Sequence, residues 1–212
     1  AIAASTGFPV LAYDRHGYGK SERVASGRTP AYRREEAGPV FGDLLRHFGI
    51  GKAVLFGHSD GGAIALLAAA AHPAAVQGVF VCAPTIALDA ETVRGMAQAR
   101  QGFEGGGLRE RLARHHGGNT DSMFWSWHDC WARADTLGWS MHEEIAALRC
   151  PVSALFGADD DYGWRPSAEA LVRHGMTVLE MLVLPGAGHH PQHRARAAAL
   201  EMLQRFIGRL GV

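Results

Sequence analysis

The chain has 212 residues, a length that favours one domain with room for an inserted subdomain. Its 21 acidic and 21 basic side chains balance, which argues against a nucleic-acid partner and against binding to an anionic membrane. No apolar run approaches the roughly 18 residues of a membrane span, and the sequence opens with no signal-peptide pattern. The three cysteines, Cys82, Cys130 and Cys150, are scattered and odd in number, which indicates reduced thiols and predicts a cytoplasmic protein.

Apolar runs alternate with helical patterns along most of the chain. In chain order, the patterns predict a strand at 9–13, a helix at 31–48, a strand at 52–56, a helix at 61–72 and a strand at 76–83. Later come a strand at 151–156, a helix starting near Pro166, a strand at 177–184 and a last helix at about 191–207. Such alternation predicts an α/β fold, with a mostly parallel sheet and helices on both of its faces.

The alternation stops in one long segment that contains helical patterns and no good strand. The expected helices lie at 89–101, 108–116 and 123–131, and a capping box at 140–143 precedes a further short helix. We therefore expect a helical cap at 85–149, inserted into an α/β core made of residues 1–84 and 150–212.

The stretch "DRHGYGKS" at residues 14–21 ends like a phosphate-binding loop, whose pattern is G-x-x-x-x-G-K-[ST]. If Gly19 closes that pattern, its first glycine must fall on position 14, which holds Asp14. A carboxylate at this position would repel the phosphate that such a loop binds. We therefore interpret Gly17 and Gly19 as residues that permit a tight turn, and we expect Lys20 to meet no phosphate.

The most informative stretch is "VLFGHSDGGAIALL", in which G-x-S-x-G stands between a predicted strand and a predicted helix. In this context the motif predicts a nucleophile elbow, a strained turn that lifts a serine hydroxyl above the carboxyl edge of a sheet. Ser59 is then the candidate nucleophile, and side chains at Gly57 and Gly61 would collide with the neighbouring strand and helix. The Asp60 N–H, at the start of the helix, is expected to face an oxyanion. A plain glycine-rich turn is the alternative interpretation.

A serine hydroxyl needs a general base, and two later stretches offer candidates. The stretch "LFGADDDYG" places carboxylates after a predicted strand, and "GAGHHPQH" places histidines after the last strand. Carboxyl ends of parallel strands meet at one edge of a sheet, so these groups can converge on the serine. A metal site at His189, His190 and His193 is disfavoured, because Pro191 breaks the helical spacing and no acidic or cysteine ligand stands nearby in the sequence.

Four stretches, "YDRHGYGKS", "GHSDGGAIALL", "LFGADDDYG" and "GAGHHP", together resemble the α/β-hydrolase superfamily. Within it they are similar to the capped microbial hydrolases that cleave esters or carbon–carbon bonds. The resemblance implies Ser59 as nucleophile, His189 as base and Asp160 as the acid that orients the base, with Asp159 and Asp161 as rivals for the last role. It also implies a small-molecule ester or acyl substrate and no cofactor.

The resemblance implies two further parts for which we find no matching stretch. The family takes a second oxyanion donor from a loop after an earlier strand, and no such stretch precedes Pro9. We therefore expect the first three strands of the family core to be missing, including the one that lies between the strands at 9–13 and 52–56. An open parallel edge predicts low stability, self-association into a homo-oligomer or altered pairing, and weak activity.

The substrate pocket is expected beneath the cap. His58 lies inside the elbow and is expected on the pocket rim. The predicted helix at 123–131 carries one apolar stripe, made of Met123, Phe124, Trp127, Cys130 and Trp131. For its tryptophans, burial inside the cap is favoured over lining the pocket. Trp125 lies off the stripe and is the better pocket candidate.

The sequence thus predicts a serine hydrolase that cleaves a small carboxylic ester or a related acyl bond through Ser59, His189 and Asp160. The main alternative is a protein of another class, a relative that keeps the fold and binds a ligand without turnover. The sequence specifies neither the substrate nor the oligomeric state.

Overall fold

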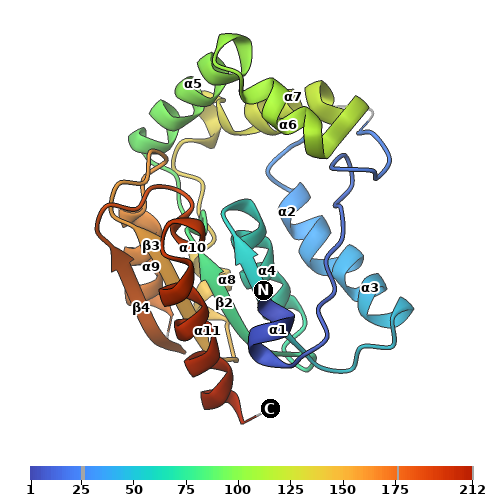
Figure 1. Cartoon of the computed structure of the whole chain (residues 1–212), viewed down its shortest axis with the longest axis vertical. Helices are drawn as coiled ribbons and strands as arrows, with labels where there is room; N and C mark the ends of the chain where they lie inside the picture. The colour runs from blue at the N-terminus through green and yellow to red at the C-terminus, as the bar shows by residue number, and fades with distance from the viewer. Residues whose placement is uncertain (25–26, 176, 212) are drawn as a thin grey trace.

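The computed structural model describes residues 1–24, 27–175 and 177–211. Four strands of this part of the chain form one parallel sheet in the order β1–β2–β3–β4. They are β1 (Ala53–His58), β2 (Val76–Cys82), β3 (Val152–Gly157) and β4 (Val178–Leu184). The prediction of a parallel α/β fold is confirmed, and all four carboxyl ends lie at the same edge of the sheet (Figure 1).

Helices cover both faces of the sheet because alternate strand residues point to opposite sides. Val79 and Val81 of β2 pack with α4 (Asp60–Ala71), α8 (His142–Ala146) and α9 (Arg165–His174) in the larger core. Phe80 and Cys82 point the other way, into a smaller core with Phe206 of α11 (Arg196–Leu210). Helix α1 (Ile2–Thr6) lies beside α11 (Figure 1). Burial on both faces explains why the strand sequences are almost continuously apolar.

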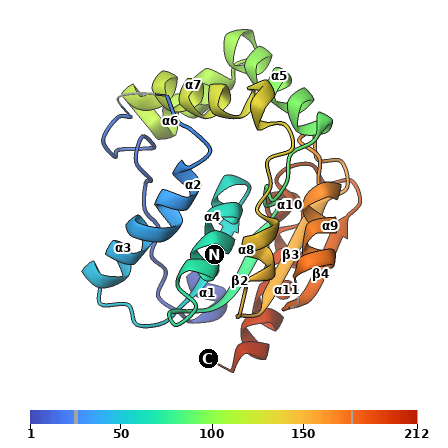
Figure 2. The same cartoon turned by 180° about the vertical axis from the view of Figure 1, so that it is seen from behind.

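The predicted helix at 31–48 is present, with a π-helical stretch in its middle. Its parts are α2 (Tyr32–Glu35), η1 (Glu36–Val40) and α3 (Phe41–His47). Pro39 lies inside the π-helical stretch, and proline has no N–H to give to an α-helical bond. This helix packs beside α4 (Figure 2).

Residues 85–149 are helical in the structure. The helices are α5 (Ala90–Gly105), α6 (Leu108–His116), η2 (Gly117–Asn119), α7 (Thr120–Trp131), η3 (Ala134–Thr136) and α8. Helices α5, α6 and α7 form a layer beyond the carboxyl edge of the sheet, whereas α8 packs against α4 and α9 (Figures 1 and 2). Asp89 caps α5 as expected, by accepting the N–H groups of Glu91 and Thr92 at 2.9 and 3.0 Å. The predicted capping box at Ser140 is wrong, because Ser140 pairs with Ala87 in a β-bridge and α8 begins after Met141.

The predicted strand at 9–13 is wrong. These residues are all described and run as an irregular segment, with Val10, Leu11 and Tyr13 exposed by 53, 46 and 40%. An apolar run becomes a strand only when a neighbour takes its backbone hydrogen bonds. Strand β1 is the edge of the sheet, and on its outer side no described residue pairs with it.

The last predicted helix is divided. It consists of α10 (Pro191–Arg194) and α11, and the backbone leaves helical geometry at Ala195, with φ −122° and ψ 55°. No helix in the described ranges is long and apolar enough to cross a membrane. The three cysteines are buried and unpaired with one another.

Candidate active site

Ser59 occupies the turn between β1 and α4. Its φ of 52° and ψ of −119° lie outside the regions that a serine ordinarily adopts, so the turn is strained. The Ser59 N–H donates to the carbonyl of Cys82 at 2.9 Å, which ties the turn to the end of β2. Asp60 opens α4, where a backbone N–H has no partner inside the helix. The backbone is therefore arranged as a nucleophile elbow.

The structure brings Ser59, His189 and Asp160 together from three separate loops at the carboxyl edge of the sheet. The Nε2 atom of His189 lies 2.8 Å from the Ser59 Oγ. The Nδ1 atom of the same ring lies 2.9 and 3.0 Å from the two carboxylate oxygens of Asp160. A hydroxyl, an imidazole and a carboxylate in this series can activate the oxygen as a nucleophile.

Of the three neighbouring aspartates, only Asp160 contacts His189 in the described structure. Its side chain is 2% exposed, and its Oδ1 also accepts the N–H of Tyr162 at 2.9 Å. Asp159 and Asp161 are exposed. The carboxylate is thus fixed from two sides and aimed at the ring.

The His58 side chain contacts the backbone of the loop that carries His189. Its Nε2 atom lies 2.7 Å from the carbonyl oxygen of His189, to which the neutral ring donates. Burial, together with the neighbouring rings of His189 and His190, lowers the pKa of His58 to about 4, and its bond to the His189 carbonyl only partly opposes this. In the described residues, no cluster of three or more His, Cys, Asp or Glu side chains is arranged to hold a metal ion.

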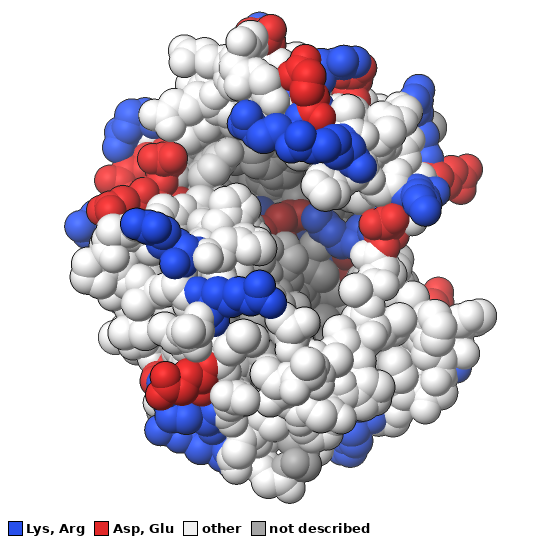
Figure 3. All heavy atoms as spheres, viewed as in Figure 1, with Lys and Arg blue, Asp and Glu red and all other residues white. Residues whose placement is uncertain are grey.

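A cavity of about 370 Å³ opens beside Ser59. Figure 3 shows the molecule hollowed between the upper helical layer and the body below it. The wall includes His58, Trp127 and Trp131 among the predicted pocket residues, with apolar groups from α5 and α7. A mostly apolar cavity of this size is typical of sites for small organic ligands.

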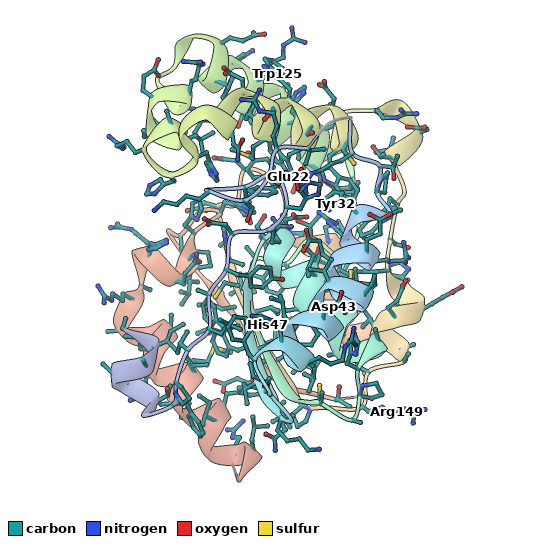
Figure 4. The ribbon with its side chains drawn as sticks, turned by 90° about the vertical axis from the view of Figure 1, so that its right-hand side faces the viewer. Glu22, Tyr32, Asp43, His47, Trp125 and Arg149 are labelled. Atoms are coloured by element: carbon teal, nitrogen blue, oxygen red, sulfur yellow. The ribbon has the colours of Figure 1, made fainter. Side chains whose placement is uncertain are left out.

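Trp125 is not part of this wall, so its prediction as the better pocket candidate is wrong. Its ring packs edge-on against Phe103, Phe124 and His128 in the upper helical layer (Figure 4). The neighbouring turns of α7 point Trp127 and Trp131 toward the cavity instead. The helical spacing predicted correctly that Trp127 and Trp131 lie on one face of α7. That face lines the cavity, whereas burial inside the cap was the favoured prediction.

The alpha/beta hydrolase fold model matches residues 1–140, more than half of the chain. The chain belongs to the alpha/beta hydrolase fold family. It is 30% identical over 180 residues to lipase LipV of Mycobacterium tuberculosis (strain ATCC 25618 / H37Rv). That alignment covers 85% of this chain and 60% of the lipase, so the chain spans about 60% of the length of this curated relative.

Solved structures of esterases share the fold of this chain. A carboxylesterase of the thaumarchaeon Nitrososphaera gargenis superposes with a TM-score of 0.70 at 20% identity, over 94% of this chain and 79% of that chain. Esterase RhEst1 from Rhodococcus sp. ECU1013 superposes with a TM-score of 0.64 at 21% identity. The superposition covers 92% of this chain and 78% of the esterase chain.

The ionic cluster around the Asp60 carboxylate was not predicted from the sequence. Oδ1 accepts from the Tyr32 hydroxyl and from Arg33 Nε, both at 2.6 Å, and Oδ2 accepts from Arg15 Nη1 at 2.7 Å. Although burial raises the pKa of Asp60, Arg33 and Arg15 outweigh it and hold that pKa well below its usual range. An aspartate in the first turn of a helix is favoured by the helix dipole, so the sequence contains no local signal that Arg15 and Arg33 would pair with it.

The glycine turn at 14–21 has its own internal anion. The Asp14 carboxylate accepts the Lys20 N–H at 2.9 Å, and the Asp14 carbonyl accepts the Ser21 hydroxyl at 2.5 Å. Gly19 adopts a φ of 53°, and an added Cβ there would strike the Asp14 carboxylate. The Asp14 side chain therefore closes the turn from within by accepting the Lys20 N–H.

We expect Gly57→Ala to lower the free energy of unfolding by about 2–3 kcal/mol, because a new methyl group would overpack a rigid backbone. A Cβ on Gly57 would lie 2.7 Å from the Gly62 Cα, with the Gly61 carbonyl closer still. Gly61→Ala is the matched control: a Cβ there meets nothing within 4 Å, so the predicted collision at Gly61 is wrong. Thermal unfolding should place Gly57→Ala well below Gly61→Ala, and equal midpoints would contradict the packing argument.

We expect His58 to make the fold acid-sensitive. Because its pKa in the fold is about 4, against 6.5 for an unperturbed histidine, the unfolded chain binds more protons between these values. The stabilisation is present above pH 6.5 and is lost as the pH falls toward 4, by about 1–3 kcal/mol. Urea unfolding of His58→Gln, which keeps a donor, should show a smaller loss over this range than the wild type. An equal loss in both would exclude His58 as its source.

Proposed function

We propose that this hydrolase cleaves small carboxylic esters, or related acyl bonds, by a serine mechanism. The observation that carries the proposal is the position of His189, in hydrogen-bond contact with Ser59 Oγ at 2.8 Å and with Asp160 at 2.9 Å. Membership of a family that contains esterases and lipases supports the same reaction class.

In the proposed mechanism His189 acts first as a general base. Its Nε2 takes the Ser59 proton as the oxygen attacks the ester carbonyl, and its Nδ1–H donates to Asp160, which stabilises the imidazolium. His189 then returns a proton to the departing alcohol. Water, activated by the same imidazole, releases the acid from the acyl-enzyme and restores Ser59.

The negative charge that develops on the carbonyl oxygen needs donors that are already in place. We propose the Asp60 N–H as one, since it opens α4 directly after the nucleophile. The ion pairs of the Asp60 side chain anchor this first turn to Arg15 and Arg33, which restricts its movement.

We propose that helices α5, α6 and α7 act as a cap, a shorter segment than the expected 85–149, because α8 packs against α4 and α9 of the core. Helices α5 and α7 contribute Met96, Phe124 and Trp127 to the wall of the cavity. These groups suit an apolar portion of the substrate and exclude water around the reacting carbonyl.

The proposal is tested by the hydrolysis of p-nitrophenyl acetate, butyrate and octanoate by the purified protein. We expect saturable turnover that ends after treatment with an organophosphate ester. A folded protein with a cooperative thermal transition and no turnover of any ester would favour the alternative, a relative that binds a ligand without catalysis.

A further inference from the structure

One end of the cavity carries more positive than negative charge. Arg15, Arg33 and Asp60 all reach the cavity wall, so two guanidinium groups face one carboxylate there. Acidic and basic atoms are visible deep in the hollow of Figure 3. An excess charge in a confined apolar space is costly unless an ion of opposite sign accompanies it.

The charged groups behind this cluster do not remove the excess. They are Arg28 and the 5% exposed Glu36, which add one charge of each sign. Burial raises the pKa of Glu36 despite the nearby Arg15 and Arg28, so Glu36 is a weaker anion than an exposed glutamate. The net charge of the five groups is therefore at least +1.

The two arginines of the cavity wall differ in their exposure and in how many of their nitrogens have hydrogen-bond partners. Arg33 is 2% exposed, bonds to Asp60 and to the Thr85 carbonyl, and lies 3.9 Å from the Trp131 ring centroid. Arg15 is 17% exposed, and in the described structure only its Nη1 has a hydrogen-bond partner. Arg15 is thus the arginine with donors left for a ligand.

The orientation of the Arg15 guanidinium is fixed. Its Cζ atom lies over the Tyr18 ring, 4.4 Å from the ring centroid, and Asp60 holds one nitrogen. Tyr18 also lines the cavity. A guanidinium has five N–H donors in a planar fork that matches a carboxylate, so one held at a single nitrogen keeps donors for such a group.

We propose that Arg15 forms a carboxylate subsite and that the natural substrates are esters that also carry a free carboxylate. This inference rests on the proposed esterase function. Arg15 and Ser59 line the same cavity, so a substrate with its ester carbonyl at Ser59 can place a second polar group at Arg15. Half-esters of dicarboxylic acids are the simplest substrates of this kind. Their methylene chain would pass the apolar wall formed by Met96, Phe124 and Trp127.

The inference is tested with two matched esters, monomethyl adipate and methyl hexanoate, which have acid parts of equal length and release the same alcohol. We expect the wild type to prefer the charged ester in kcat/KM by about 10- to 100-fold, the gain from a hydrogen-bonded charge pair. Arg15→Gln should bring this ratio close to one. The control Arg100→Gln, which alters an exposed arginine on α5, should leave the ratio unchanged.

Arg15→Lys covers the case in which Arg15→Gln does not fold, because it keeps the positive charge beside Asp60. Lacking the planar fork, it should lower the preference several-fold. A wild-type enzyme that prefers the neutral ester, or variants at Arg15 that keep the full preference, would overturn the inference.

Failure of the proposed function is distinguishable from failure of this inference. If neither ester is hydrolysed, calorimetric titration with adipate still tests the subsite. Saturable binding to the wild type that weakens several-fold in Arg15→Lys supports it, whereas the absence of binding, or equal binding to both proteins, contradicts it.

Discussion

Replacement of Ser59 by alanine is expected to lower kcat/KM for small esters by about 10⁴- to 10⁶-fold. The reason is that a triad acts as a unit: without its nucleophile, His189 and Asp160 have no oxygen to activate. The substitution removes one oxygen atom and leaves the cavity wall intact, so the variant should keep its thermal midpoint and still bind the product acid.

Steady-state hydrolysis of p-nitrophenyl butyrate measures this effect. Ser5→Ala is the control, because Ser5 lies in α1, outside the cavity wall, and its hydroxyl donates to the Ile2 carbonyl. A folded Ser59→Ala variant that retains activity within tenfold of the wild type would place the nucleophile elsewhere.

Replacement of Asp60 by alanine is expected to lower the free energy of unfolding by about 3–5 kcal/mol. Removal of one partner from a buried ion pair leaves an uncompensated charge. Here the charge left behind would include Arg33, which is 2% exposed, and Tyr32 would lose its acceptor as well. The stabilisation is present above about pH 4, the usual pKa of an aspartate, and is lost as the pH falls below that value, because the folded-state pKa is depressed.

Urea unfolding followed by tryptophan fluorescence measures this loss. Asp121→Ala is the matched control, since Asp121 pairs with Arg109 through two hydrogen bonds at 2.7 Å but on the open surface. Exposed pairs contribute little, so we expect no change in the unfolding midpoint of this variant. Equal behaviour of Asp60→Ala and Asp121→Ala would show that the buried cluster does not hold the fold together.

Local patterns predicted most of the fold, because strands buried on both faces and helices with one apolar stripe leave clear signatures. The nucleophile elbow could also be predicted from a local pattern, because Gly57, Ser59 and Asp60 are consecutive or nearly so and stand between a strand and a helix. His189 and Asp160 required knowledge of a family, since the groups lie 29 residues apart in the chain and 130 residues separate His189 from Ser59.

The predictions that were wrong or missing have a different cause. In each case the structure depends on residues that are distant in the chain. Residues 9–13 have the composition of a strand, but no described strand lies beside them. Trp125 and Trp127 are two positions apart on one helix, and only the packing of α7 on its neighbours decides which ring meets the cavity. The pairing of Arg15 and Arg33 with Asp60 spans 45 and 27 residues, beyond the reach of any local pattern.

Covalent labelling tests whether Ser59 is an activated nucleophile. The purified protein is treated with a fluorophosphonate and the modified residue is located by peptide mass spectrometry. We expect one equivalent of label on Ser59, reduced at least a hundredfold in rate by His189→Gln. A folded protein that takes up no label, or that is labelled at another residue, would show that Ser59 is not an activated nucleophile.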